Sequence, residues 1–252
     1  MNGSEVTFED FVMRHFPPGR IATFVGAGGK SSGMRAVAGV LSRRGLRVRI
    51  TTTTRIGVAE FSPLPVALVR SESEILDSFA AETPVEVISA GVLGANEKHM
   101  GVELSLLGRR ALPDDLVLLV EGDGARRMPM KAPRPHEPVI PVASAAVFAL
   151  MGAAAFGEPV DSRNCCNPEG VLAVLGRQNA VFDAAALSLL AGSASGSRKG
   201  VLPGMAFHLV VNQGDLADKR QIAHGLLARV RESGISATLL SWREQRIYET
   251  AW

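Results

Sequence analysis

A glycine-rich segment holds the residues whose types and spacing best suit chemistry. In this 252-residue sequence, residues 26–32 follow an apolar run directly and open a helical period, which is the setting of a phosphate-binding loop. A polyphosphate needs converging backbone N–H groups, a path without Cβ atoms and a lysine near its terminal oxygens. We therefore predict that phosphate is bound by Gly26, Ala27, Gly28, Gly29, Lys30, Ser31 and Ser32. The alternative is a glycine-rich turn with an exposed lysine.

The spacing of this segment differs from the best-known phosphate loop. The pattern G-x-x-x-x-G-K-[ST] would need glycine where Phe24 stands. The segment instead fits a shorter form, G-x-x-G-K-[ST]-[ST], which is seen in nucleotide-dependent ligases of the Mur type. In this loop Lys30 would stabilise charge on a transferred phosphoryl group, and Ser31 would be a Mg²⁺ ligand.

Two acidic residues follow a second apolar run. Residues 117–120 are continuously apolar, and Glu121 and Asp123 come directly after them with glycines beside each. In nucleotide-hydrolysing proteins an acidic residue at such a strand end contacts Mg²⁺ or orients the attacking water. We predict that Glu121 and Asp123 are catalytic together with Lys30, and that both are metal ligands together with Ser31. The alternative is an acidic glycine turn, which is common in α/β proteins.

A third motif is typical of nucleobase recognition. Asn212 and Asp215 flank the pair Gln213-Gly214 after a predicted strand. An Asn-x-x-Asp at this place reads guanine in guanine-nucleotide binders, because a carboxylate offers only acceptors. Gln213 replaces the usual lysine, and Asn and Asp are also ordinary turn and N-cap residues. We predict base reading by Asn212 and Asp215 and leave the choice between GTP and ATP open.

Polar residues outside these motifs are candidates for contact with a substrate or partner. The threonine run at residues 51–54 ends a predicted strand, where ligands bind in open α/β sheets. A proline-rich stretch, residues 128–141, would form a stiff loop that holds polar groups still. The candidates are Thr53, Lys98, Arg126, Lys131, His136 and Glu137. Alternatively the threonines form a β-favouring edge, Lys98 is solvated, and His136 and Glu137 fix the loop.

The composition excludes several classes of protein. Lys and Arg number 27 against 25 Asp and Glu, a net charge of +2 that would not draw the protein to nucleic acid or to an acidic membrane surface. The near-neutral total hides a local cluster of Lys30, Arg126, Arg127, Lys131 and Arg134. The most apolar stretch, residues 139–156, is interrupted by polar residues, proline and glycine, so we predict no membrane span.

The only two cysteines, Cys165 and Cys166, are adjacent in the sequence. Neighbouring cysteines rarely form a structural disulfide, because the small ring strains the peptide between them. We therefore predict a reduced, cytoplasmic protein. Thiolates could bind soft sulfur or selenium, but two neighbours lack the spacing of a metal site.

Short β-branched runs alternate with helical periods along the chain, which predicts a parallel sheet. Predicted strands cover residues 21–25, 47–51, 66–69, 85–89, 116–120, 146–150, 207–211 and 236–240. Helices are predicted near the N-terminus, after residue 30, and over residues 73–81 and 216–233. We predict one P-loop NTPase-like domain over residues 1–252, a three-layer α/β sandwich with a mostly parallel sheet and a small helical insertion at about 160–200.

Taken together, these motifs resemble the YqeC family, proposed accessory proteins of selenium-dependent molybdenum hydroxylases. The resemblance covers residues 24–215, and Gly122 stands where a small residue such as alanine is expected. It rests on the phosphate loop, residues 51–54, residues 120–126, Lys131-Ala132-Pro133 with residues 136–141, and residues 212–215. A looser likeness, through Glu121, is to metal-delivery GTPases that load nickel enzymes.

The resemblance implies a role in maturing a molybdenum hydroxylase or its cofactor, with that enzyme or cofactor as partner. With the phosphate loop, it predicts a Mg²⁺-dependent protein that binds and hydrolyses GTP or ATP. One alternative is an ATP-dependent ligase or kinase that acts on a small cofactor precursor. The other is a nucleotide-switched binding module without useful hydrolysis.

Overall fold

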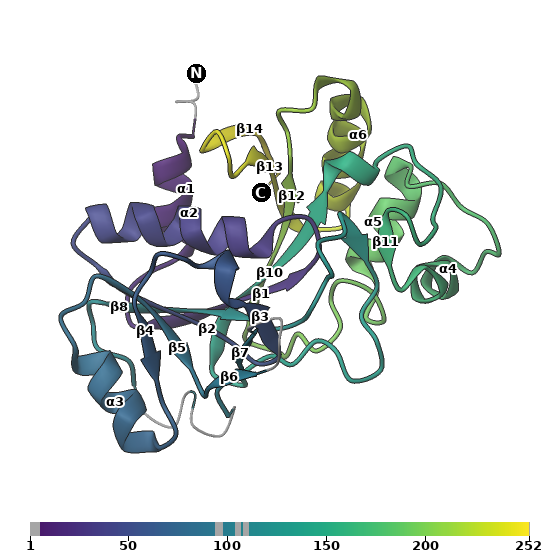
Figure 1. Ribbon diagram of the computed structural model, residues 1–252. Coiled ribbons are helices and arrows are strands. Elements are labelled where there is room, and N and C mark those ends of the chain that lie inside the picture. The colour runs from purple at the N-terminus through teal and green to yellow at the C-terminus, as the bar shows by residue number, and fades with distance from the viewer. Residues whose placement is uncertain (1–5, 94–97, 104–106, 108–110, 252) are drawn as a thin grey trace.

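A nine-stranded sheet runs through the centre of the molecule (Figure 1). The computed structural model describes residues 6–93, 98–103, 107 and 111–251. All neighbouring strands of this sheet pair in parallel except the last two in the sequence, which are antiparallel at one edge. In spatial order they are β14 (Arg246–Ala251), β13 (Ser236–Ser241), β12 (Ala206–Asn212), β10 (Ser144–Gly152), β1 (Arg20–Gly26), β8 (Leu116–Glu121), β2 (Arg47–Thr52), β5 (Val85–Ser89) and β4 (Val66–Leu68).

Helices and two small sheets complete the described part of the chain. The helices are α1 (Phe8–His15), α2 (Lys30–Arg43), α3 (Glu72–Ala80), α4 (Pro168–Leu175), α5 (Ala184–Gly192) and α6 (Arg220–Glu232), with 3₁₀ turns η1 (Val58–Glu60), η3 (Ala153–Ala155) and η4 (Ala217–Lys219). One small sheet holds β3 (Arg55–Gly57), β7 (Lys98–Met100) and β6 (Val92–Leu93), and the other pairs β9 (Met130–Lys131) with β11 (Cys165–Cys166).

The large sheet lies between two layers of helices, because successive side chains of each strand point to opposite faces. Phe24 and Ile50 pack in one buried cluster with the apolar faces of α1 and α2. On the other face, Leu118 packs with α3, while Leu209 belongs to a third cluster that includes α5 and α6. Figure 1 shows α1 and α2 together on one side of the strands.

The structure confirms the predicted α/β fold with a mostly parallel sheet flanked by helices. Each predicted strand is present within one or two residues of its predicted ends, and α4 and α5 lie in the predicted insertion. The antiparallel strand β14 and the two small sheets were not predicted. Among the described residues, no helix combines the length and the apolarity that a membrane crossing requires.

The parallel arrangement brings the predicted motifs to one edge of the sheet. Glu121, at the end of β8, is the register partner of Phe24 in β1 and of Thr52 in β2. Asn212, at the end of β12, is the partner of Gly152 in β10. Segments far apart in the sequence therefore meet around the loop that joins β1 to α2, as expected for a ligand site at the carboxyl ends of parallel strands.

Candidate nucleotide site

The loop between β1 and α2 follows a path that requires glycine. Gly26, Gly28 and Gly29 have φ values of +87°, +92° and +116°. A Cβ atom on Gly28 would lie 2.3 Å from the backbone nitrogen of Gly152, and one on Gly26 would lie 2.5 Å from the carbonyl oxygen of Leu150. The loop therefore passes directly against the end of β10 and turns into α2 at Lys30.

The backbone N–H groups of this loop divide into two sets. Those of Gly26, Ala27 and Gly28 donate within the protein, to the carboxylate of Asp123 and to the carbonyl oxygens of Leu150 and Met128. Helix geometry leaves the N–H groups of the first turn of α2 without intrahelical acceptors. The first turn carries no acidic residue, and residues 29–32 all line a cleft. The part of the loop suited to an anion is therefore residues 29–32, while residues 26–28 shape its path.

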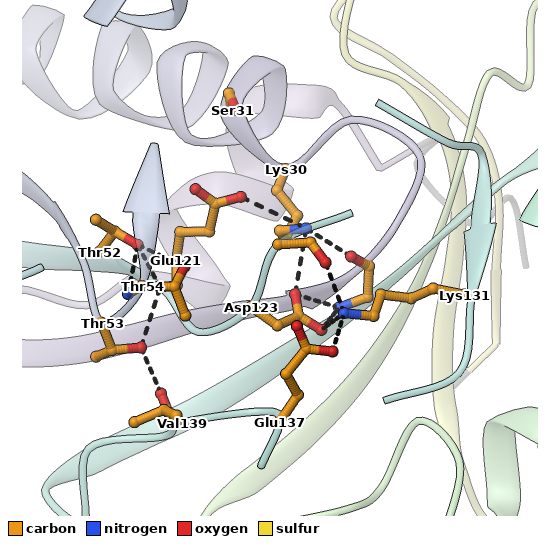
Figure 2. A network of polar contacts seen from close by, with 12 residues as sticks. Lys30, Ser31, Thr52, Thr53, Thr54, Glu121, Asp123, Lys131, Glu137 and Val139 are labelled. Atoms are coloured by element: carbon orange, nitrogen blue, oxygen red, sulfur yellow. Dashed lines mark hydrogen bonds and ion pairs between the residues drawn. The ribbon is translucent and has the colours of Figure 1, made fainter. Parts of the chain in front are cut away.

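Lys30 is buried beneath this loop, with 4% of its surface exposed. Its Nζ atom donates to the carbonyl oxygen of Gly26 at 2.5 Å and lies 3.2 Å from Asp123 and 3.5 Å from Glu121 (Figure 2). Burial alone would lower the pKa of Lys30, but the two carboxylates outweigh it and raise that pKa. Lys30 is thus a charged, internally paired lysine, unlike the exposed lysine of a simple glycine-rich turn.

Asp123 joins the phosphate loop to the proline-rich loop. Besides its contacts with Gly26 and Lys30, its carboxylate lies 3.0 Å from Nζ of Lys131. Lys131 in turn donates to Glu137 at 2.8 Å and to the carbonyl oxygen of Gly124. The lysine outweighs the effect of burial and lowers the pKa of Glu137. Figure 2 shows the resulting chain of alternating charges, which we call the buried ion network: Lys30, Glu121, Asp123, Lys131 and Glu137.

Glu121 is the member of the network with unused bonding capacity. One carboxylate oxygen faces Lys30, whereas Oε2 is buried and makes no hydrogen bond in the described part of the chain. Burial raises the pKa of Glu121 to about 7, with Lys30 opposing the rise and Asp123 and Glu60 adding to it. Glu121 is also among the residues that line the cleft, and an unpartnered carboxylate oxygen is a suitable ligand for a hard cation such as Mg²⁺.

Ser31 faces a residue that the sequence did not identify. Its hydroxyl donates a hydrogen bond to Glu60, at the end of η1. Glu60 lines the cleft, and its negative charge helps to raise the pKa of Glu121. Nothing in the sequence around Glu60 marks it, because its approach to Ser31 depends on how η1 lies against α2. The side-chain oxygen atoms of Ser31, Glu60 and Glu121 therefore lie near the phosphate loop, where they could serve as metal ligands.

Of the two residues predicted to read a base, Asn212 lines the cleft and Asp215 does not. The Asn212 amide donates to the carbonyl oxygen of Gly28 at 2.8 Å and accepts from the backbone N–H of Trp242, so it fastens the loop to the end of β13. Asp215 pairs with Arg243 at 2.7 Å and is outside the cleft lining. Trp242 does line the cleft, and its indole N–H is buried without a partner in the described residues.

The cleft has a volume of about 1370 Å³ and contains some of the predicted contact residues but not others. Lys98 and Arg126 line it, together with the unpredicted Arg55 and with Arg127. Thr53 instead donates to the carbonyl oxygen of Val139 at 2.7 Å, and so holds the proline-rich loop. Lys131 and Glu137 are buried in the ion network, and His136 is exposed outside the cleft lining.

Cys165 and Cys166 are both free and buried, and neither lines the cleft. Burial raises the pKa of Cys165 to about 12, with Cys166 and Glu169 adding to the effect. A thiol with this pKa stays protonated at neutral pH and is a poor ligand or nucleophile. Among the described residues, no group of three or more His, Cys, Asp and Glu side chains has the arrangement of a metal site.

The sequence model of the YqeC protein family matches residues 22–169, more than half of the chain. The chain belongs to the YqeC family. A relative from Escherichia coli (strain K12), named "Uncharacterized protein YqeC", is 35% identical over 147 residues. That alignment covers 57% of this chain and 56% of the relative, so the chain matches only about half of the relative's length. The family match contains the phosphate loop and the buried ion network, whereas Asn212 and Trp242 lie beyond it.

Proposed function

We propose that this YqeC protein binds a nucleoside triphosphate, GTP or ATP, with Mg²⁺ and hydrolyses it. The observation that carries this proposal is the start of α2. There residues 29–32, which include the buried Lys30, line the cleft. Backbone N–H groups and the positive end of a helix bind phosphate directly. On binding, we expect a phosphate oxygen to replace the carbonyl oxygen of Gly26 as a partner of Lys30.

The residues present fit Mg²⁺. Ser31, Glu60 and Glu121 would hold the ion. The buried Oε2 atom of Glu121, which has no hydrogen-bond partner in the described residues, would be one of its ligands. Mg²⁺ would neutralise the negative charge that develops on the phosphoryl oxygens during transfer. Lys30 would stabilise the same charge from the loop side. Asp123, which is 2% exposed, holds Lys30 and the loop backbone in place.

Calorimetry with Mg·GTP and Mg·ATP tests this proposal and also selects the base. We expect one nucleotide to bind, and Lys30→Ala to weaken it at least about tenfold, because it removes a charge-assisted hydrogen bond. Ser31→Ala, a smaller change, should reduce the Mg²⁺ dependence of binding. Circular dichroism verifies that each variant is folded. Absence of binding by the wild-type protein to either nucleotide, or equal affinity in a folded Lys30→Ala variant, would contradict the proposal.

The family resemblance supports a second part of the proposal, that hydrolysis assists the maturation of a molybdenum hydroxylase or its cofactor. The test is to mix the protein and its preferred Mg·nucleotide with an immature hydroxylase. We expect faster activation than with the Lys30→Ala variant. An equal rate for the two proteins would contradict this role and leave nucleotide binding untouched.

A further inference from the structure

Four cationic side chains that have no partner among the described residues line the cleft beside the phosphate loop. They are Arg55, Lys98, Arg126 and Arg127, which we call the basic wall. None of the four makes a salt bridge or side-chain hydrogen bond within the described residues. Arg35, also in the cleft, differs because it donates to the carbonyl oxygens of Glu60 and Ser62. Because like charges along one cleft repel one another, four cations without partners in the described residues are suited to an anionic ligand.

Half of the basic wall comes from the small sheet. Arg55 is the register partner of Met100 in the β3–β7 pair, and Gly57 is the partner of Lys98. Residues two apart on a strand point to the same face, so Arg55 and Lys98 share one face of this sheet. The small sheet therefore presents two cations to the cleft from segments more than 40 residues apart in the sequence.

The other half of the wall lies on a strained turn. Arg126 and Arg127 have φ values of +51° and +61°, and the N–H of Met128 donates to the carbonyl oxygen of Ala125. A β-turn with positive φ at both central positions is normally made by glycine, asparagine or aspartate. Each arginine in this conformation costs roughly 1–2 kcal/mol. Strain of this kind is found mainly at functional sites, and here it holds two guanidinium groups at the cleft.

The strained turn is also attached to the nucleotide site. The carbonyl oxygen of Met128, the last residue of the turn, accepts from the N–H of Gly28 at 3.1 Å. The next residue, Pro129, accepts from the N–H of Gly152 at 2.9 Å. Two backbone hydrogen bonds thus hold the turn with Arg126 and Arg127 next to the phosphate loop.

We propose that the basic wall binds a second ligand, a small organic phosphate, beside the nucleotide. This inference rests on the proposed function and names the class of its second substrate. A nucleotide bound with Mg²⁺, Lys30 and the first turn of α2 already has its phosphate charge compensated, so four further cations exceed its need. The cleft, at about 1370 Å³, is larger than the roughly 300–1,000 Å³ of a typical small-molecule site.

Fructose 1,6-bisphosphate is a suitable probe, because it carries two phosphate groups and neutral fructose is its matched control. It is titrated by calorimetry into the full chain saturated with a non-hydrolysable Mg·nucleoside triphosphate. We expect one saturable site for the bisphosphate and none for fructose. Absence of saturable binding would overturn the proposal.

Double substitutions that remove two positive charges test where the bisphosphate binds. Arg126→Gln with Arg127→Gln, and separately Arg55→Gln with Lys98→Gln, should each weaken the bisphosphate at least about tenfold and change the triphosphate affinity less than about twofold. The control, Arg43→Gln with Arg229→Gln, removes two exposed charges outside the cleft and should change neither affinity. If the pairs weaken the triphosphate equally, or the control weakens the bisphosphate equally, the proposal is overturned.

The Lys30→Ala variant separates this inference from the proposed function. If the wild-type protein binds no triphosphate, the proposed function fails, and the bisphosphate is titrated into the nucleotide-free protein. Binding that survives Lys30→Ala but is lost in the arginine pair then supports the second site. Binding that is lost in Lys30→Ala belongs to the phosphate loop and overturns the second site.

Discussion

Two groups of cations near the phosphate loop, those of the buried ion network and those of the basic wall, differ in how their charge is compensated. In the buried ion network, Lys30 and Lys131 are almost fully covered and each contacts carboxylates and a carbonyl oxygen. In the basic wall, Arg126 and Arg127 are exposed to the cleft and have no internal partner within the described residues. Arg127 of the wall and Lys131 of the network are close together in the sequence.

This difference shows which charges belong to the fold and which are available to a ligand. A buried ammonium group must be paired, because the desolvation of an unpaired charge costs several kcal/mol. An exposed guanidinium stays solvated and can exchange water for a ligand. The network therefore links the phosphate loop to the proline-rich loop, and the wall has charge that an anionic ligand could compensate. The predictions below act on one group at a time.

Asp123→Ala should give the largest loss of stability, because it leaves Lys30 and Lys131 without their shared carboxylate and removes the acceptor of the Gly26 N–H. Breaking a buried pair from one side costs about 3–5 kcal/mol. Urea denaturation followed by circular dichroism measures this loss. Asp123→Asn keeps an oxygen acceptor and should lose less. A loss below about 1 kcal/mol in Asp123→Ala would show that the network is not structural.

The effect of Glu121→Gln on the free energy of unfolding should depend on pH, and this distinguishes it from Asp123→Ala. Folding raises the pKa of Glu121 from 4.5 to about 7, so the folded state binds the proton more tightly than the unfolded chain. This group's contribution to stability is therefore present below pH 4.5 and is lost as the pH rises to about 7. Glutamine does not titrate. The free energy of unfolding of the variant, relative to wild type, should rise by up to about 3 kcal/mol across that range.

The measurement is a series of urea denaturations from pH 4.5 to 8, with EDTA present to exclude divalent cations. Glu137→Gln is the control, because Lys131 lowers the pKa of Glu137 rather than raising it. The contribution of Glu137 to stability is therefore already present above pH 4.5, and the difference between that variant and wild type should stay nearly constant over this range. If the difference in the free energy of unfolding between Glu121→Gln and wild type does not change with pH, burial does not raise the pKa of Glu121.

The sequence predicted the fold well, together with part of the lining of the candidate site. The strands and α2 follow from local patterns, since buried parallel strands read as continuous apolar runs and glycines mark the loop. The sequence also identified Lys30, Ser31 and Glu121, because their chemistry depends on their position at strand and helix ends. All three line the cleft.

The remainder of the site depends on contacts between distant segments. Glu60 meets Ser31 only through the placement of η1, and Arg55 and Lys98 share a face only through the β3–β7 pairing. No local pattern indicates that Asp123 contacts both Lys30 and Lys131 and lies outside the cleft lining. Nor could it show positive φ at Arg126 and Arg127, since arginine does not signal such a turn.

Arg127→Gly should give the smallest change in stability, with the opposite sign to Asp123→Ala. Glycine adopts positive φ without steric cost, and it is the preferred residue at the second central position of this kind of turn. Relief of the strain, less the entropy that glycine loses on folding, should raise the free energy of unfolding by about 0.5–1 kcal/mol. The same variant should bind the fructose 1,6-bisphosphate probe more weakly.

Arg127→Ala is the matched control, because it removes the guanidinium but retains the strained φ. It should therefore bind the probe more weakly without the gain in stability. If both variants leave stability unchanged, the turn holds no strain at Arg127. If Arg127→Gly gains stability and binds the probe as tightly as wild type, the strain does not serve that ligand, and the contrast between the basic wall and the buried ion network is one of solvation alone.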